Sequence, residues 1–197
     1  MVAADHAAIV LAAGRSRRLG RPKQLLRVDG VSLLRRTVAA VLATQPVLVG
    51  VVLAADAPAV AAEIAGLPVV TWFNPMPDAG LSGSLRVAAC ALAAHAGPTL
   101  IVGVDQPRLG TDHLEALLQA GRVHGGDVVT GYGPAFGIPA RVTAATLAQA
   151  VDLSGDGGLK RLWLAAPPQR VQADALGFDL DTPADLAVAV ARGWIDA

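Results

Sequence analysis

The chain has 197 residues, a length that suits one domain with a single hydrophobic core. Its 16 basic and 16 acidic side chains cancel, which argues against a general attraction to nucleic acid or to an anionic membrane. A single cysteine, Cys90, excludes an internal disulfide and a metal site built from cysteines. No apolar stretch approaches the roughly 18 residues of a membrane-spanning helix, so we expect a soluble cytoplasmic protein.

Short runs of β-branched residues alternate with alanine-rich segments of helical spacing, which predicts an α/β protein with a largely parallel sheet. The predicted strands are residues 8–12, 47–55, 68–73, 99–105 and 127–132. Ser82 and Thr111 are predicted to cap the helices that follow them, and Gly121 is predicted to end a helix.

The alternation weakens after residue 132. Residues 145–151, 158–165 and 183–193 keep helical spacing, and residues 175–181 predict one further, weak strand. No repeat or linker divides the sequence, so we predict one domain over residues 1–197.

Ligands of open parallel sheets bind beyond the carboxyl ends of the strands, which here means the loops after residues 12, 73, 104 and 132. The first loop contains LAAGRSRRLGRPK, residues 11–23, and 8 of the 16 basic side chains lie between Arg15 and Arg36. Glycine loops expose backbone N–H groups, and nearby cations neutralise phosphate, so this loop predicts an anion site. Its spacing matches neither the Walker A motif nor the dinucleotide motif GxGxxG.

Residues 11–26, LAAGRSRRLGRPKQLL, resemble the signature L-x-x-G-x-S-x-R-x-G-x-x-K of the MobA-like NTP transferase family, which includes the enzymes that finish the molybdenum cofactor. The matching positions are Leu11, Gly14, Ser16, Arg18, Gly20 and Lys23. The resemblance implies a three-layer Rossmann-like nucleotidyltransferase fold with a mainly parallel central sheet.

The same resemblance assigns roles within the loop. The base and the ribose phosphates are expected to meet the segment Leu11, Ala12, Ala13 and Gly14, while Arg15, Ser16, Arg18 and Lys23 are expected to hold the triphosphate. The alternative is a solvated basic turn, and Arg17 and Arg21 are assigned to solvent.

Residues 73–85, FNPMPDAGLSGSL, resemble the segment N-P-x(4)-G-x-x-x-S-L of the molybdenum cofactor branch. This resemblance implies nucleotide contacts for Asn74, Gly80, Ser82 and Ser84. The alternative is an ordinary capped helix after a long loop.

Two aspartates are candidate metal ligands. Asp105 ends an apolar strand within VGVDQPRL, where it could be a turn former or a ligand, and the resemblance implies a Mg²⁺ ligand. Residues 177–186, GFDLDTPADL, resemble the family segment D-I-D-T-P-E-D-L. This resemblance implies that Asp181 is a second Mg²⁺ ligand, and the alternative is that Asp181 has only a structural role at the start of the following helix. Asp179 and Asp185 are assigned to solvent or to a helix cap.

Region 131–161 is expected to face the acceptor substrate. GYGPAFGIPARV resembles a family segment that usually reads G-x-x-G-H-P, but Ile138 stands where histidine is common. SGDGGLKRL is similar to the segment G-D-x-G-x-x-x-L through Gly155, Asp156 and Gly158. The identity of the acceptor therefore stays open.

The resemblance covers residues 8 to 188 and implies a Mg²⁺-dependent nucleotidyltransferase whose catalytic residues are Arg15, Arg18, Lys23 and Asp105. Ala13 and Pro22 match the residues of the cytidylyltransferase relatives at these positions, which favours CTP as the donor. The resemblance then implies molybdopterin carrying molybdenum as the acceptor and a molybdoenzyme or chaperone as a partner. GTP, or a sugar or alditol phosphate, is an alternative substrate. An NAD-dependent oxidoreductase and a non-catalytic molybdenum cofactor chaperone are alternative functions, and the missing GxGxxG argues against the first.

Overall fold

The computed structural model describes residues 6–153 and 158–197. Its centre is a seven-stranded sheet in the order β5-β4-β1-β6-β8-β7-β9. The strands are β1 (Ala7–Leu11), β4 (Leu48–Ala54), β5 (Val70–Asn74), β6 (Thr99–Gly103), β7 (Val128–Tyr132), β8 (Ala135–Val142) and β9 (Gln169–Gln172). Within this sheet β8 runs antiparallel to β6 and β7, and the remaining pairs are parallel. A separate short hairpin pairs β2 (Arg27–Val28) with β3 (Val31–Ser32).

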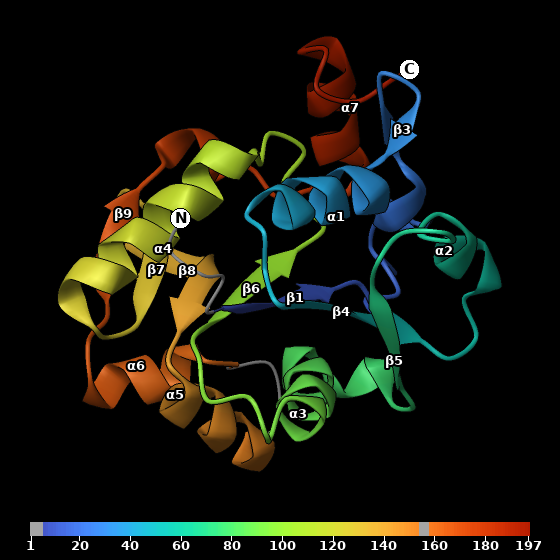
Figure 1. The fold of residues 1–197 in the computed structure, drawn as a ribbon. Coiled ribbons are helices and arrows are strands. Elements are labelled where there is room, and N and C mark those ends of the chain that lie inside the picture. Colours follow the sequence, from blue (N-terminus) through green and yellow to red (C-terminus); the bar gives the residue numbers. More distant parts are fainter. Residues whose placement is uncertain (1–5, 154–157) are drawn as a thin grey trace.

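Helices cover both faces of the sheet and form a three-layer arrangement (Figure 1). One face carries α1 (Leu33–Ala43), α2 (Pro58–Ala62), α4 (Thr111–His124) and α7 (Pro183–Ala191), and the other carries α3 (Leu81–Ala91), α5 (Ala144–Gln149) and α6 (Lys160–Ala165). In β1, Ala8 and Val10 belong to one hydrophobic core and Ala7 and Ile9 to the other. Successive side chains of a strand point to opposite faces, so both cores are anchored on this buried strand.

The topology gathers the candidate loops at one edge of the sheet. The chain leaves β1, β5, β6 and β7 at their carboxyl ends, and antiparallel β8 begins at the same edge. The segment before α7 also reaches this edge, because the N–H of Leu180 donates to the carbonyl of Asp105 at 3.0 Å. Segments far apart in the sequence therefore meet where the sequence predicts a site.

The five strands predicted up to residue 132 are confirmed as β1, β4, β5, β6 and β7. The strand predicted for residues 175–181 is wrong, since a 3₁₀ turn over Asp174–Leu176 begins before this segment and the residues from 177 to 181 form no strand. Strand β8 was not predicted because Gly137 and Pro139 interrupt the strand pattern. It forms nevertheless, because β6 and β7 pair with it on both sides.

Three helix-boundary predictions are wrong. Helix α3 is capped at Gly80, which leaves Ser82 buried in the first turn, and α4 is capped at Gly110 rather than Thr111. Helix α4 continues through Gly121 and ends at Gly125, whose φ of 75° suits glycine.

The start of α7 is capped by Thr182, and Asp185 takes the cap role that was one of the two assigned to it. The Thr182 hydroxyl accepts from the N–H of Asp185 at 3.2 Å, and the Asp185 carboxylate accepts from the N–H of Thr182 at 2.8 Å. This reciprocal capping box also holds the chain that carries Asp181. In the described part of the chain, no helix is long and apolar enough to cross a membrane.

Candidate functional site

The glycine loop after β1 folds back on itself around Ser16. Ser16 has a φ of 51°, and its carbonyl accepts from the N–H groups of Leu19 and Gly20, both at 3.1 Å. Its hydroxyl accepts from the N–H of Lys23 at 3.1 Å. Gly20 has a φ of 78°, a conformation that glycine adopts without strain. The spacing of Ser16, Gly20 and Lys23 therefore shapes the loop, and the contact of Ser16 with a triphosphate stays a prediction.

Gln24 is a buried residue of the site that was not predicted from the sequence. Its Nε2 donates to the carbonyl oxygens of Ala12 and Gly14, at 2.7 and 2.8 Å. The N–H of Ala12 is also hydrogen-bonded, since it donates to the carbonyl oxygen of Val52 at 2.9 Å. Ala12 thus has both backbone groups bonded within the protein. The available signal was a polar residue between Lys23 and two leucines.

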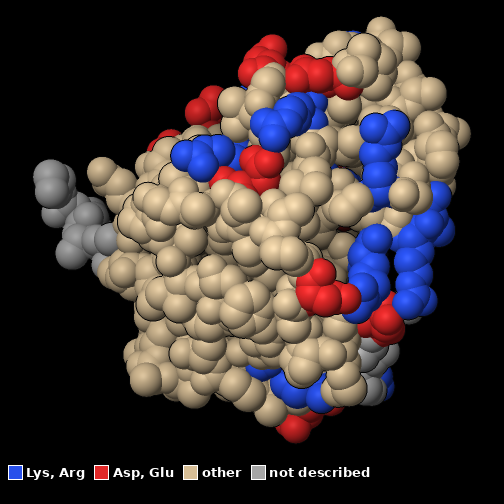
Figure 2. Space-filling model, turned by 90° about the vertical axis from the view of Figure 1, so that its right-hand side faces the viewer, with Lys and Arg blue, Asp and Glu red and all other residues tan. Residues whose placement is uncertain are grey.

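Arg15 and Arg17, two exposed arginines of the loop, are paired with acidic residues. Arg15 contacts Asp56 at 2.9 Å and Asp78 at 3.4 Å, and Arg17 contacts Asp78 at 2.8 Å. Exposed ion pairs of this kind contribute little to stability. Figure 2 shows basic side chains with acidic ones beside them on the side of the molecule that carries α2 and β5. A polyanion that reaches Arg15 must therefore compete with two carboxylates.

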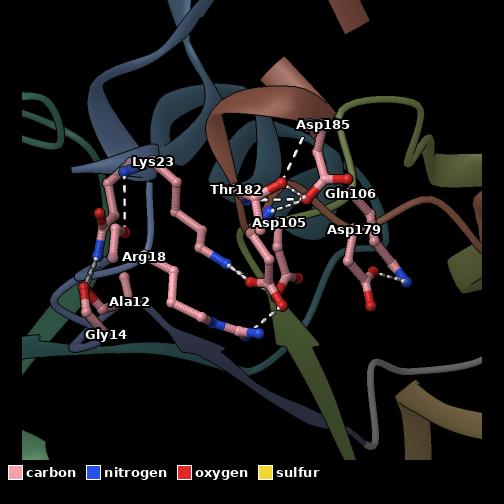
Figure 3. Close-up of polar contacts among 12 residues, drawn as sticks. Ala12, Gly14, Arg18, Lys23, Asp105, Gln106, Asp179, Thr182 and Asp185 are labelled. Atoms are coloured by element: carbon pink, nitrogen blue, oxygen red, sulfur yellow. Dashed lines mark hydrogen bonds and ion pairs between the residues drawn. The ribbon is translucent and has the colours of Figure 1, made fainter. Parts of the chain in front are cut away.

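Lys23 lies at the centre of a second, less exposed cluster (Figure 3). Its Nζ is 2.8 Å from the Asp181 carboxylate and 3.4 Å from that of Asp105, while Arg18 donates to Asp181 at 2.7 Å. The Lys23 side chain is only 15% exposed. The structure thus brings together Arg18, Lys23, Asp105 and Asp181, which were selected from three separate sequence segments.

The charges in this cluster stabilise one another. Burial by itself lowers the pKa of Lys23, but the carboxylates of Asp105 and Asp181 outweigh this effect and raise the pKa above its usual value. The hydrogen bond from Lys23 lowers the pKa of Asp181. At neutral pH the ammonium group and the Asp181 carboxylate are therefore both charged.

Asp105 and Asp181 are the two predicted metal ligands, and their carboxylates lie close enough together to be compared with what a divalent cation needs. Both carboxylates converge on one ammonium group, so one positive charge can interact with both. Among residues 6–153 and 158–197, no group of three or more His, Cys, Asp or Glu side chains is placed to hold a metal. Mg²⁺ is commonly held by one or two carboxylates together with phosphate oxygens and water, so this pair fits such an ion.

A cavity of about 220 Å³ lies between the glycine loop and this cluster. The predicted site residues among those that line it are Leu11, Ala13, Gly14, Lys23, Gly80, Ser84 and Asp105. Asn74 and Ser82 do not line this cavity. Both are buried, and Asn74 supports its wall by donating to Ser84 at 3.1 Å and by accepting from the N–H of Met76 at 2.9 Å.

A larger cavity, of about 440 Å³, adjoins the first and shares Asp105, Leu81 and Ile138 with it. Its walls include three aromatic side chains, Tyr132, Phe136 and Trp163. Ile138 and Gly158, both from the region expected to face the acceptor, also line it, whereas Gly155 and Asp156 lie outside the described residues.

Gln106 and Asp179 supply polar groups to the larger cavity. Asp179 is an exposed residue, in agreement with its assignment to solvent, and its side chain also lines this cavity. Partial desolvation of the carboxyl group in the cavity, together with the nearby Asp105 carboxylate, raises the pKa of Asp179 to about 6. Gln106 donates to the Tyr132 hydroxyl at 2.7 Å. It also donates to Asp179 at 3.4 Å (Figure 3). Gln106 was missed in the sequence, although it directly follows the candidate ligand Asp105.

A mainly parallel α/β sheet with a cationic glycine loop and two carboxylates at its carboxyl edge defines a nucleotide-binding class of protein. The model of the MobA-like NTP transferase domain matches residues 8–171. The chain therefore belongs to the MobA-like NTP transferase family, whose members are nucleotidyltransferases. Comparison with curated proteins gives no match.

Solved structures agree with this assignment. The chain is 29% identical to an Rv0371c homologue from Mycobacterium sp. strain JC1, with a TM-score of 0.80 and coverage of 95% of this chain and 96% of the other. It is 25% identical to Rv0371C of Mycobacterium tuberculosis H37Rv in complex with manganese, with a TM-score of 0.77 and coverage of 93% and 97%. A nucleotidyl transferase from Methanothermobacter thermautotroptrophicus, 24% identical, has a TM-score of 0.78 with coverage of 95% and 97%, and it shows the shared fold alone.

Proposed function

We propose that the protein transfers CMP from CTP to a phosphate-bearing acceptor, molybdopterin carrying molybdenum, and releases pyrophosphate. The observation that carries this proposal is the cluster of Arg18, Lys23, Asp105 and Asp181, which reaches two adjoining cavities through Lys23 and Asp105. One cavity borders the glycine loop and suits a nucleotide, and the other suits a second substrate. Asp105 lines both, so the two substrates meet beside it.

The chemistry follows from this arrangement. A phosphate oxygen of the acceptor attacks the α-phosphorus of CTP, a new P–O bond forms, and the bond between the α-phosphorus and the bridging oxygen breaks. Its electron pair leaves with pyrophosphate. A phosphate monoester is already ionised near neutral pH, so no general base is needed, and catalysis consists of positioning and charge neutralisation.

The residues of the cluster divide this work. Lys23 and Arg18 neutralise the triphosphate, and Arg15 joins them after it exchanges its acidic partners for phosphate oxygens. Mg²⁺ held by Asp105 and Asp181 would add positive charge at the phosphate oxygens. The manganese complex of the mycobacterial relative supports a divalent metal in this family. The Lys23 ammonium group contacts the carboxylates of both Asp105 and Asp181. A metal ion needs these same carboxylates, so we expect the metal and the nucleotide to bind together.

The walls of the larger cavity favour a flat heterocyclic acceptor. Tyr132, Phe136 and Trp163 offer aromatic surface, and Asp179, Gln106 and Lys160 offer polar groups at separate points. Such a lining suits a pterin better than a sugar phosphate, whose hydroxyl groups need many polar partners.

The choice of CTP rests on Ala13. Its side chain lines the smaller cavity and is only 2% exposed, so the methyl group removes space beside the loop. We expect Ala13→Gly to raise kcat/KM with GTP relative to CTP by about tenfold, because pocket volume discriminates by 1–3 kcal/mol. Competition between the two nucleotides measures this ratio. An unchanged ratio would remove Ala13 as the selector.

The test of the proposed function is pyrophosphate release with each of the four nucleoside triphosphates, with and without molybdopterin carrying molybdenum. The expected result is release that requires the acceptor, a divalent metal and CTP. Pyrophosphate release with GTP instead of CTP would change the proposed donor. Pyrophosphate release with a sugar phosphate instead of molybdopterin would change the proposed acceptor. No release with any pair would refute it.

A further inference from the structure

We propose that Gln24 is a positioning residue for the nucleotide. Its side-chain amide holds two carbonyls of the glycine loop inward, so that the N–H groups of Ala13 and Arg15 are presented to the oxygen or nitrogen acceptors of a nucleoside triphosphate. The inference rests on the proposed nucleotidyl transfer and assigns a role to a buried side chain that contacts the loop and also borders both cavities beside it.

The contacts of Gln24 determine which end of the amide faces the loop. The side chain is 3% exposed, and one nitrogen reaches two carbonyl oxygens, those of Ala12 at 2.7 Å and Gly14 at 2.8 Å. A carbonyl oxygen only accepts hydrogen bonds, so the NH₂ group of Gln24 must lie here. Both of its hydrogens can then be used by the loop.

The geometry of the peptide bond then determines where the N–H groups of the next residues point. In a trans peptide, the carbonyl of one residue and the N–H of the next point in opposite directions. The carbonyl of Ala12 points to Gln24, so the N–H of Ala13 points away from it, and the carbonyl of Gly14 places the N–H of Arg15 in the same way. Within the described residues, no hydrogen bond occupies either N–H group.

These two N–H groups lie next to space for a ligand. Ala13 and Gly14 line the cavity of about 220 Å³ beside Lys23. Together with Arg15 they also border a cavity of about 270 Å³ that adjoins the same loop. Backbone N–H groups on successive turns of a loop form a preorganised anion site, provided that the carbonyls point elsewhere.

The other end of the amide lowers the stability that Gln24 can contribute. Its Oε1 is buried and has no hydrogen-bond partner in the described part of the chain. A buried, unpaired acceptor costs free energy, which an apolar side chain of similar size would avoid. An apolar side chain would, however, leave the carbonyls of Ala12 and Gly14 without a donor and free to rotate toward the nucleotide.

The test is Gln24→Leu, which keeps the size of the side chain and removes the donor. We expect the Kd for CTP, measured by calorimetry well below the melting temperature, to rise about tenfold or more, as the loss of a preorganised hydrogen bond implies. KM for CTP should rise with it, while kcat falls less. Affinity for Mn²⁺ alone should not change, because Asp105 and Asp181 are untouched.

The matched control is Gln119→Leu, an exposed glutamine of α4 whose replacement should leave Kd unchanged. A lowered melting temperature with an unchanged Kd would show a merely structural role and overturn the inference. Should Gln24→Leu fail to fold, amide hydrogen exchange on the wild type decides, since the N–H groups of Ala13 and Arg15 should slow when CTP binds. Unchanged exchange would overturn the inference alone, whereas a wild type that binds no nucleotide would overturn it together with the proposed function.

Discussion

Replacing Lys23 with methionine is expected to lower kcat/KM for pyrophosphate release by about a hundredfold to a thousandfold, the range for loss of one preorganised electrostatic contact. Lys23 is 15% exposed and contacts both carboxylates of the cluster, so its charge is poorly screened by solvent. Methionine keeps most of the apolar stem and removes the charge. Steady-state kinetics with CTP and acceptor measure the loss.

The matched control is Arg21→Met, an exposed basic side chain of the same loop that was assigned to solvent and should keep full activity. Lys23→Met should also raise the pKa of Asp181, since the hydrogen bond from Lys23 is the main cause of its lowered value. Carbon-detected NMR of the aspartate carboxyl groups measures that shift. Near wild-type kcat/KM in Lys23→Met would exclude Lys23 as the residue that neutralises the phosphates.

Asp105→Asn is expected to lower metal-dependent pyrophosphate release by about a hundredfold or more, because metal coordination contributes several kcal/mol to charge stabilisation. An amide keeps the shape of the carboxylate and removes its charge. Mn²⁺ titration followed by electron paramagnetic resonance should show weaker binding with CTP present. Pyrophosphate release that survives the change would mean that the metal assignment is wrong.

Asp105→Asn should also lower the pKa of Lys23. Burial already lowers this pKa, and the Asp105 carboxylate is the largest influence that raises it, so removing the carboxylate shifts the balance downward. NMR titration of the Lys23 ammonium group measures the change. Asp112→Asn, an exposed aspartate in the first turn of α4, is the control and should change neither metal binding nor the Lys23 pKa.

Much of the fold could be predicted because local pattern and tertiary position agree there. Strands β1, β4 and β6 are apolar runs buried on both faces, and their loops carry the glycines and charges typical of a ligand site. The cap at the start of α7 is also local, and it uses Asp185 in one of the two roles assigned to it from the sequence. The prediction of a single domain was not tested, and the roles of the site residues stay predictions.

Other features could not be predicted because they depend on distant partners. Strand β8 carries Gly137 and Pro139, and its pairing with β6 and β7 overrides the poor local pattern. In the sequence, Gln24 has no feature that separates it from an ordinary helix-forming residue, because its contacts with the carbonyls of the loop form only in the folded chain. Asp179 was assigned to solvent or to a helix cap, and only the arrangement around Gln106 and Tyr132 shows that it borders a cavity.

By itself, the sequence of this protein determined the α/β class, the glycine loop and the candidate charges, because strand periodicity and loop chemistry are local properties of the chain. Only the tertiary structure decided that Lys23, Asp105 and Asp181 share one cluster, that Asn74 and Ser82 are buried without lining the cavity beside the glycine loop, and that the Gln24 side chain donates to the loop. These are distances between segments separated by many residues, and the packing of the sheet, rather than any local pattern, sets them.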